Sequence, residues 1–109
     1  MECSIKPEAG YDLLQLSGEV DMHFSPELRE TILDKIKDGS PLLIDMGNVS
    51  YIDSSGIASL VEGYQTAKTA NLPFGLLNIS GAAMQVLTLT RLDKIFSLYT
   101  NAEQFRQEL

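Results

Sequence analysis

Two serines and a carboxylate lie together in the segment Tyr51-Ile52-Asp53-Ser54-Ser55-Gly56-Ile57. An apolar run ends in this segment and a helical pattern begins, so the side-chain oxygens lie beside backbone N–H groups that lack partners within the helix. Such a helix start favours a negative charge. The segment is therefore predicted to act as a phosphorylation switch rather than as a catalytic centre.

Intrinsic catalysis is disfavoured by the groups that the sequence lacks. A nucleophilic serine needs a base and a third group that orients the base, but His23 is the single histidine of the chain. Neither a Gly-x-Ser-x-Gly elbow nor a glycine-rich loop followed by Lys-Ser or Lys-Thr is present. The single cysteine, Cys3, gives no metal cluster. The sequence predicts a binding protein that is not an enzyme and has no cofactor.

Composition and charge limit the class of protein and its partners. The chain has 109 residues, of which 44% are hydrophobic and 21% charged, as expected for a single folded domain over residues 1–109. Its net charge of −7 makes nucleic acid and anionic membranes poor partners. No secretory signal is recognisable, and no apolar run approaches the roughly 20 residues that cross a bilayer. We expect a cytoplasmic protein without direct membrane insertion.

Short apolar runs bounded by turn residues predict five strands. The Leu42–Ile44 run is continuously apolar, which is typical of a central strand covered on both faces. The predicted strands are Ser4–Lys6, Tyr11–Leu16, Leu42–Ile44, Phe74–Ile79 and Ile95–Tyr99.

Helical patterns follow four of these strands. The first begins at Ser25-Pro26-Glu27, with the serine as cap and the proline at the first helical position. The second runs from Ser55 to about Ala70, and the third opens at Ser80-Gly81. The last begins at Thr100, which forms a capping box with Glu103. Because parallel neighbours need crossover connections, this order predicts an α/β domain with a mixed, mostly parallel sheet of about five strands and about four helices.

Three segments carry a resemblance to a known family. They are Gly18–Asp21, the stretch from Leu43–Met46 through Asp53–Gly56, and Leu89–Phe96. In this order they resemble the STAS domain of bacterial anti-sigma factor antagonists, also called anti-anti-sigma factors. The resemblance extends from about Ser4 to Phe105 and implies a single STAS domain.

The resemblance implies a regulatory mechanism. In that family an anti-sigma factor that is also a serine kinase phosphorylates the second serine of the Asp-Ser-Ser-Gly motif, and a phosphoserine phosphatase restores it. The unphosphorylated antagonist binds the kinase and frees the sigma factor for transcription, whereas the phosphoprotein does not bind. By this resemblance Ser55 is the phosphoacceptor. We expect free N–H groups and the helix dipole to tolerate its phosphate within the domain, so that binding is lost at the interface.

Eight residues are expected at the partner-binding surface. Asp21 matches the family's acidic residue after the second strand, and two neighbours are assigned by their position in that loop. From the residues, either Ser54 or Asp53 caps the helix. Gly56 either lets a partner approach the serine hydroxyl closely or is a flexible joint between the strand and the helix. The eight residues are Asp21, His23, Ser25, Asp53, Ser54, Gly56, Ser59 and Glu62.

One alternative keeps the fold and changes the partner. STAS domains also serve as cytoplasmic subunits of lipid-trafficking ABC transporters, which would dock through the helix surface around residues 54–65. The presence of both serines in Asp53–Gly56 favours the kinase. The sequence does not decide whether the chain binds nucleotide or forms a homodimer.

Overall fold

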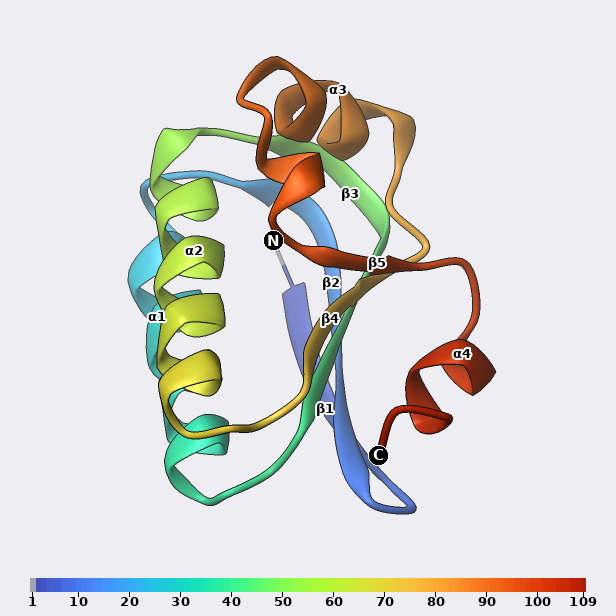
Figure 1. The fold of residues 1–109 in the computed structure, drawn as a ribbon. Helices are drawn as coiled ribbons and strands as arrows, with labels where there is room; N and C mark the ends of the chain where they lie inside the picture. The colour runs from blue at the N-terminus through green and yellow to red at the C-terminus, as the bar shows by residue number, and fades with distance from the viewer. Residues whose placement is uncertain (1) are drawn as a thin grey trace.

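A computed structural model describes residues 2–109, in which five strands form one mixed sheet (Figure 1). The strand order is β1-β2-β3-β4-β5; β1 is antiparallel to β2, and the other neighbours are parallel. The predicted α/β class and mixed sheet are confirmed. The strands are β1 (Glu2–Glu8), β2 (Tyr11–Val20), β3 (Leu42–Ile52), β4 (Phe74–Leu77) and β5 (Ser97–Tyr99).

Helices cover both faces of this sheet (Figure 1). The helices α1 (Ser25–Lys37) and α2 (Ser54–Thr69) lie side by side on one face. The helix α3 (Gly81–Leu89) packs against the second half of β3, the short 3₁₀ helix η1 (Leu92–Lys94) follows it and contacts β5, and α4 (Ala102–Arg106) lies on the opposite face. No helix within residues 2–109 is long and apolar enough to cross a membrane.

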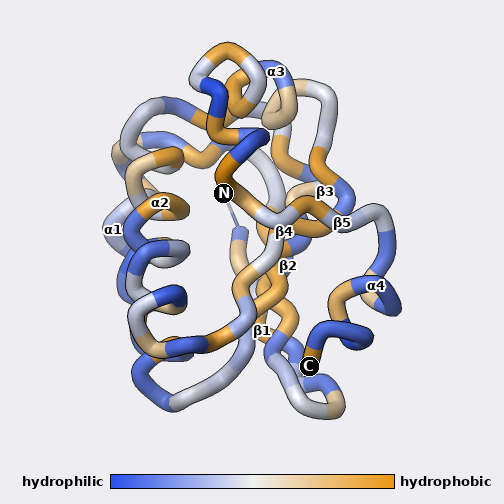
Figure 2. Tube along the Cα trace, viewed as in Figure 1, coloured by the Kyte–Doolittle hydropathy of each residue, from blue (hydrophilic) through white to orange (hydrophobic). Residues whose placement is uncertain are grey.

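The larger apolar core lies between the sheet and the α1–α2 layer. Alternate residues of β2 and β3 face these helices, and α1 contributes Leu28, Ile32 and Ile36 at a spacing of four. Figure 2 shows apolar positions along the strands and polar positions on the outer helix faces. A smaller cluster on the other face holds α4 through Phe105, whose ring lies edge-on to Tyr11 and Tyr99 at centroid distances of 5.4 Å.

The central strands extend further than the apolar runs predicted. β2 continues to Val20 and β3 to Ile52, and their pairing shifts register between Gln15 and Ser17 and again between Gly18 and Glu19. Ser17 and Gly18, which suggested a strand end, lie at these bulges, so the strand continues past them. β4 ends early at Leu77, because the next residue, Asn78, has a positive φ of 54°.

The predicted caps of α1 and α4 are wrong. Ser25 is the first residue of α1, the preceding residue occupies the cap position without a side-chain bond, and the Ser25 N–H donates to the Asp21 carbonyl at 2.9 Å. At α4 the cap is Asn101, whose Oδ1 accepts from Gln104 N at 3.0 Å, and Gln104 Oε1 in turn accepts from Thr100 N. The cap therefore lies one residue after the predicted one, and Gln104 bonds the residue before the cap, so the two bonds do not form the reciprocal capping box.

We expect Gly63→Ala to destabilise the domain. A Cβ at Gly63 would lie 2.5 Å from Ile32 Cγ2 and 3.2 Å from the Phe74 ring, and a β-branched isoleucine cannot rotate away freely. Overpacking costs roughly 1–3 kcal/mol, more than the gain of about 0.5–1 kcal/mol in helix propensity. Urea unfolding should therefore give a lower free energy of unfolding.

Gly81→Ala is the matched control. A Cβ at this first residue of α3 meets no atom within 4 Å. Its free energy of unfolding should equal or slightly exceed that of the wild type. A Gly63→Ala protein as stable as the control would show that α1 and α2 do not meet as closely as described.

Candidate functional site

The topology brings two segments together at the carboxyl end of the sheet. The parallel strands β2 and β3 end opposite each other, with Val20 paired to Ile52. The residues that follow are then held by cross-connections: Asp53 N donates to the Val20 carbonyl at 3.2 Å, and Met22 N donates to Asp53 Oδ2 at 3.1 Å. The loop after β2 and the start of α2, predicted separately, thus form one site.

Asp53 is the cap of α2 and the centre of this site. Its Oδ1 accepts hydrogen bonds from Ser55 N at 2.9 Å, Gly56 N at 3.1 Å and the Ser55 hydroxyl at 2.6 Å. The Ser55 hydroxyl is the main cause of the lowered pKa of Asp53, with backbone donors adding to it. The carboxylate is therefore ionised near neutral pH. Ser54, the other cap considered, is exposed and its hydroxyl has no partner within residues 2–109.

The same geometry corrects one expectation about the helix start. The backbone N–H groups of Ser55 and Gly56 were expected to be free for an anion, but both already donate to Asp53. A phosphate at this position cannot use them without displacing the carboxylate. The partial positive charge of the helix dipole still favours an anion there.

Gly56 is required by packing inside the domain. A Cβ would lie 2.8 Å from Ile52 Cγ1, 2.9 Å from Val20 Cγ1 and 3.0 Å from the Val20 carbonyl oxygen. The missing side chain therefore lets α2 begin directly against the ends of β2 and β3. The close approach that the sequence suggested is made by this chain's own strands, and a contact between Gly56 and a partner stays a prediction.

The loop between β2 and α1 has its own internal support. Asp21 Oδ1 accepts from His23 N at 3.0 Å and from Phe24 N at 3.3 Å. This carboxylate therefore stabilises its own loop and makes no hydrogen bond to the Ser55 side chain in the described structure. The His23 ring lies edge-on to Phe24 with centroids 5.0 Å apart. Met22 is 74% exposed at the tip. Methionine side chains are usually buried, but the structure places this one at the surface.

A groove of about 650 Å³ leads from Ser55 along the contact between α1 and α2. Ser25 and Ser59 are buried in its wall, and Ser59 Oγ donates to the Ser25 carbonyl at 3.2 Å and to the Ser55 carbonyl at 3.1 Å. These two serines therefore link the helices. Glu62 accepts two hydrogen bonds of 2.7 Å from Arg29, which lower the pKa of Glu62.

Arg29 was not predicted as a site residue. Its place in the apolar spacing of α1 marks it as an outward-facing position, next to the buried Leu28, but nothing in the sequence pairs it with Glu62 across 33 positions. The contact depends on how α1 and α2 align. Sequence patterns within one helix do not contain that information.

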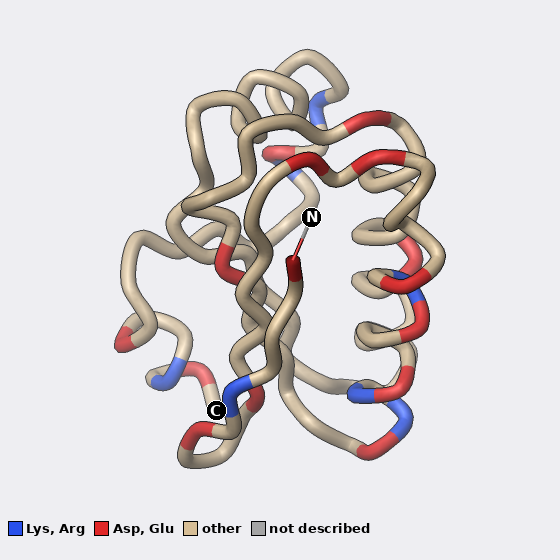
Figure 3. Tube along the Cα trace, turned by 180° about the vertical axis from the view of Figure 1, so that it is seen from behind, with Lys and Arg blue, Asp and Glu red and all other residues tan. Residues whose placement is uncertain are grey.

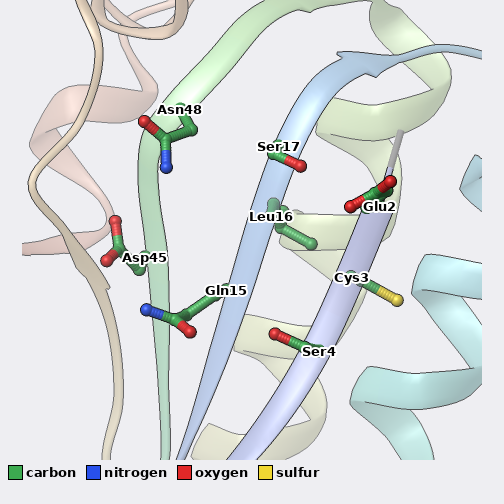
Figure 4. A pocket seen from close by; sticks show the side chains of 8 residues that line it. All are labelled: Glu2, Cys3, Ser4, Gln15, Leu16, Ser17, Asp45 and Asn48. Carbon is green, nitrogen blue, oxygen red and sulfur yellow. The ribbon is translucent and has the colours of Figure 1, made fainter.

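A second hollow, of about 250 Å³, lies on the opposite face of the sheet (Figure 4). Polar side chains of β1, β2 and β3 surround it, while Cys3 and Leu16 point toward the helices. None of the predicted site residues lines it. Its polar lining consists of Glu2, Ser4, Gln15, Ser17, Asp45 and Asn48.

Charge and metal ligands complete the description of the surface. Acidic residues occur along α1 and at the strand ends, and basic residues are fewer (Figure 3). Within residues 2–109 no group of three or more His, Cys, Asp or Glu side chains could hold a metal ion.

The fold and this serine-bearing helix start define the class of protein. The STAS domain family model matches residues 6–105, and the chain belongs to the STAS domain family. The recognised family and fold are thereby confirmed. Among curated relatives, the anti-sigma-B factor antagonist of Bacillus subtilis is 28% identical over 90 residues, or 83% of each chain. That of Listeria monocytogenes is 26% identical over 84 residues, covering 76% of this chain and 74% of the relative.

Solved structures agree with this assignment. An anti-sigma factor antagonist from Mycobacterium paratuberculosis is 28% identical, with a TM-score of 0.83 over 98% of this chain and 92% of that one. The antagonist SpoIIAA in its unphosphorylated form has a TM-score of 0.81 at 20% identity, covering 94% and 91%. Bacillus SpoIIAA in the phosphorylated form has a TM-score of 0.77 at 19% identity, covering 98% of each chain. The two SpoIIAA structures share the fold with this chain.

We expect Asp53→Ala to lower the melting temperature by roughly 4–8 °C, the usual effect of losing a helix cap in a small domain. The carboxylate also ties Met22 N to the start of α2, and this link is lost as well. Ser54→Ala is the matched control, because its hydroxyl has no partner in the described chain. Equal losses in the two variants would contradict Asp53 as the cap.

The loss of stability caused by Asp53→Ala should become smaller as the pH falls. The pKa of Asp53 is lowered in the folded protein from its ordinary value of 3.8. Its contribution to stability is therefore fully present above about pH 4 and is lost as the pH falls through the lowered pKa. Melting curves from about pH 6 down to pH 2 should show the wild type and the variant converging at the acid end.

Proposed function

We propose that this chain is an anti-sigma factor antagonist that binds an anti-sigma factor serine kinase and is released by phosphorylation of Ser55. Through this exchange it would regulate sigma-factor-dependent transcription. The observation that supports it best is the Ser55 hydroxyl, held 2.6 Å from the Asp53 carboxylate at the start of α2. The antagonist names of the curated relatives support the same function.

Phosphorylation would change the Ser55 side chain in two ways. The esterified oxygen has no proton to donate to Asp53, and the phosphate adds roughly −1.5 to −2 charge. Because the neighbouring carboxylate is ionised and already occupies the helix-start N–H groups, it repels the phosphate. The phosphate is therefore directed away from the cap and toward the surface.

The domain itself should tolerate this modification. Asp53 keeps its bonds from Ser55 N, Gly56 N and Met22 N, none of which needs the serine hydroxyl. The helix dipole also favours the added anion. SpoIIAA, which shares the fold, has solved structures in unphosphorylated and phosphorylated forms, and this supports a fold that accommodates phosphate.

Loss of binding would then arise at the interface. Met22, His23 and Ser54 are exposed around Ser55, and a partner docked there desolvates the serine. A dianion forced against a partner's anionic group costs several kcal/mol. In this proposal Met22, His23, Ser54 and Glu62 contact the partner.

The other predicted residues would act on the shape of the surface. Asp21 and Asp53 hold the loop and the helix start, and Gly56 allows their close packing. Ser25 and Ser59 fix the two helices against each other. A phosphoserine phosphatase would complete the cycle by restoring the hydroxyl.

The chain itself is proposed to contribute no catalytic group. The His23 ring lies against Phe24 and makes no hydrogen bond with Ser55 in the described structure. The kinase would therefore supply the base and the nucleotide.

Affinity capture from the source organism with added ATP tests the partner and the modified residue together. We expect a serine kinase to be captured, and intact-mass measurement to show one phosphoryl group, located on Ser55 by fragmentation. Ser54→Ala should gain the same single group. Capture of ABC transporter subunits without phosphorylation would favour the lipid-trafficking alternative instead.

Two substitutions at Ser55 test the switch with the captured kinase. Ser55→Asp should fold normally and bind the kinase roughly a hundredfold more weakly, because a fixed anion mimics part of the phosphate charge. Ser55→Ala should bind like the wild type and accept no phosphate. Equal affinity of Ser55→Asp and wild type, measured by calorimetry, would contradict the switch, as would phosphate on Ser55→Ala.

A further inference from the structure

The groove between α1 and α2 contains an ion pair that shares it with the proposed phosphoacceptor. Arg29 donates from Nε and Nη2 to the two carboxylate oxygens of Glu62, and both residues line the groove beside Ser55. Their side chains are 53% and 42% exposed, so water screens the pair and its contribution to stability is small. Within residues 2–109 the other charged groups lining the groove are the carboxylates of Glu30 and Asp34.

We propose that Arg29 binds the phosphate of phosphorylated Ser55 and leaves Glu62 to do so. This inference rests on the proposed function, since it requires a phosphate on Ser55. A phosphoserine offers up to twice the charge of a carboxylate and three acceptor oxygens. A guanidinium binds phosphate through paired hydrogen bonds in the same geometry that it uses with Glu62. The dianion is therefore the stronger partner.

The alignment of the helices brings Arg29 within reach. Ser59 Oγ donates to the carbonyls of both Ser25 and Ser55, so the first turns of α1 and α2 lie at the same level. Arg29 lies one turn, about 6 Å, further along α1 than Ser25. Helical side chains lean toward the N-terminus, and Arg29 and Ser55 line the same groove. In this proposal the exchange takes place by rotation of the arginine side chain within the groove.

The capping geometry directs the phosphate to the same place. Asp53 occupies the N–H groups of Ser55 and Gly56 and repels a second anion. The phosphate therefore turns away from the cap and toward the groove, which is lined by the Arg29 guanidinium. The three carboxylates along the groove oppose its entry, which leaves Arg29 as the group that stabilises it there.

The exchange would spread the effect of phosphorylation along α2. Glu62 lies seven residues, about 10 Å of helix, after Ser55. Once Arg29 leaves it, its carboxylate is unpaired at the surface proposed to contact the partner. One modification would thus alter charge at both ends of the groove.

The test uses protein with phosphoserine placed at position 55 during translation, so that no kinase is needed. The second pKa of the phosphate is measured by ³¹P NMR titration. We expect Arg29→Gln to raise this pKa by about half a unit, because the cation that favours the dianion is lost. Glu62→Gln should lower it below the wild-type value, because the competing carboxylate is removed, and Arg29→Lys should lie between wild type and Arg29→Gln.

Arg91→Gln is the matched control, since Arg91 lies after α3, is exposed and has no ion pair within residues 2–109. Its phosphate pKa should equal that of the wild type. Equal pKa values in Arg29→Gln, Arg91→Gln and wild type would overturn the proposal. So would Nε–H signals of Arg29 that stay unchanged when the wild type is phosphorylated. Neither result bears on whether a kinase modifies Ser55 or whether phosphorylation releases a partner.

Discussion

The structure of the site depends on one carboxylate. Asp53 binds the first turn of α2 through Ser55 and Gly56, the loop after β2 through Met22, and the serine hydroxyl. A helix start, a strand end and a candidate modification site are therefore held by the same charged group. A negative charge added to Ser55 is repelled by this carboxylate. Because the same carboxylate holds the loop after β2 and the start of α2, a modification of Ser55 bears directly on the group that shapes the surrounding surface.

Much of the fold follows from patterns within short segments. Apolar runs and helical spacing predicted the order of elements, and the continuously apolar Leu42–Ile44 segment lies in the central strand β3. Errors arose where long-range pairing overrides local signals. Gly18 suggested a strand end, but its positive φ of 83° lies at a bulge and β2 continues to Val20. The caps of α1 and α4 were misplaced by one residue for different reasons. At α4, Thr100 and Asn101 can both cap a helix, whereas at α1 the backbone turn from Asp21 starts the helix one residue early and Phe24 has no capping side chain.

The candidate site was predictable in its residues and less so in their roles. From sequence Ser54 was a candidate for the cap and Asp53 the alternative, because either side chain can accept a helix-start N–H. The structure distinguishes them by the position of the Asp53 carboxylate between two segments. Arg29 could not be found, since its pairing with Glu62 arises from the packing of α1 on α2 around Ser59 and Gly63.

The two apolar clusters have different consequences for local opening. α4 has five residues, and Phe105 is the residue it buries fully, between Tyr11 and Tyr99. Its amides can therefore exchange with solvent through a local fluctuation that leaves the large core intact. The start of α2 belongs to the other cluster, through Ile57 and Leu60. Local opening of α4 therefore leaves the surroundings of Ser55 unchanged. The amide hydrogens of α4 and those at the start of α2 can exchange with solvent at independent rates.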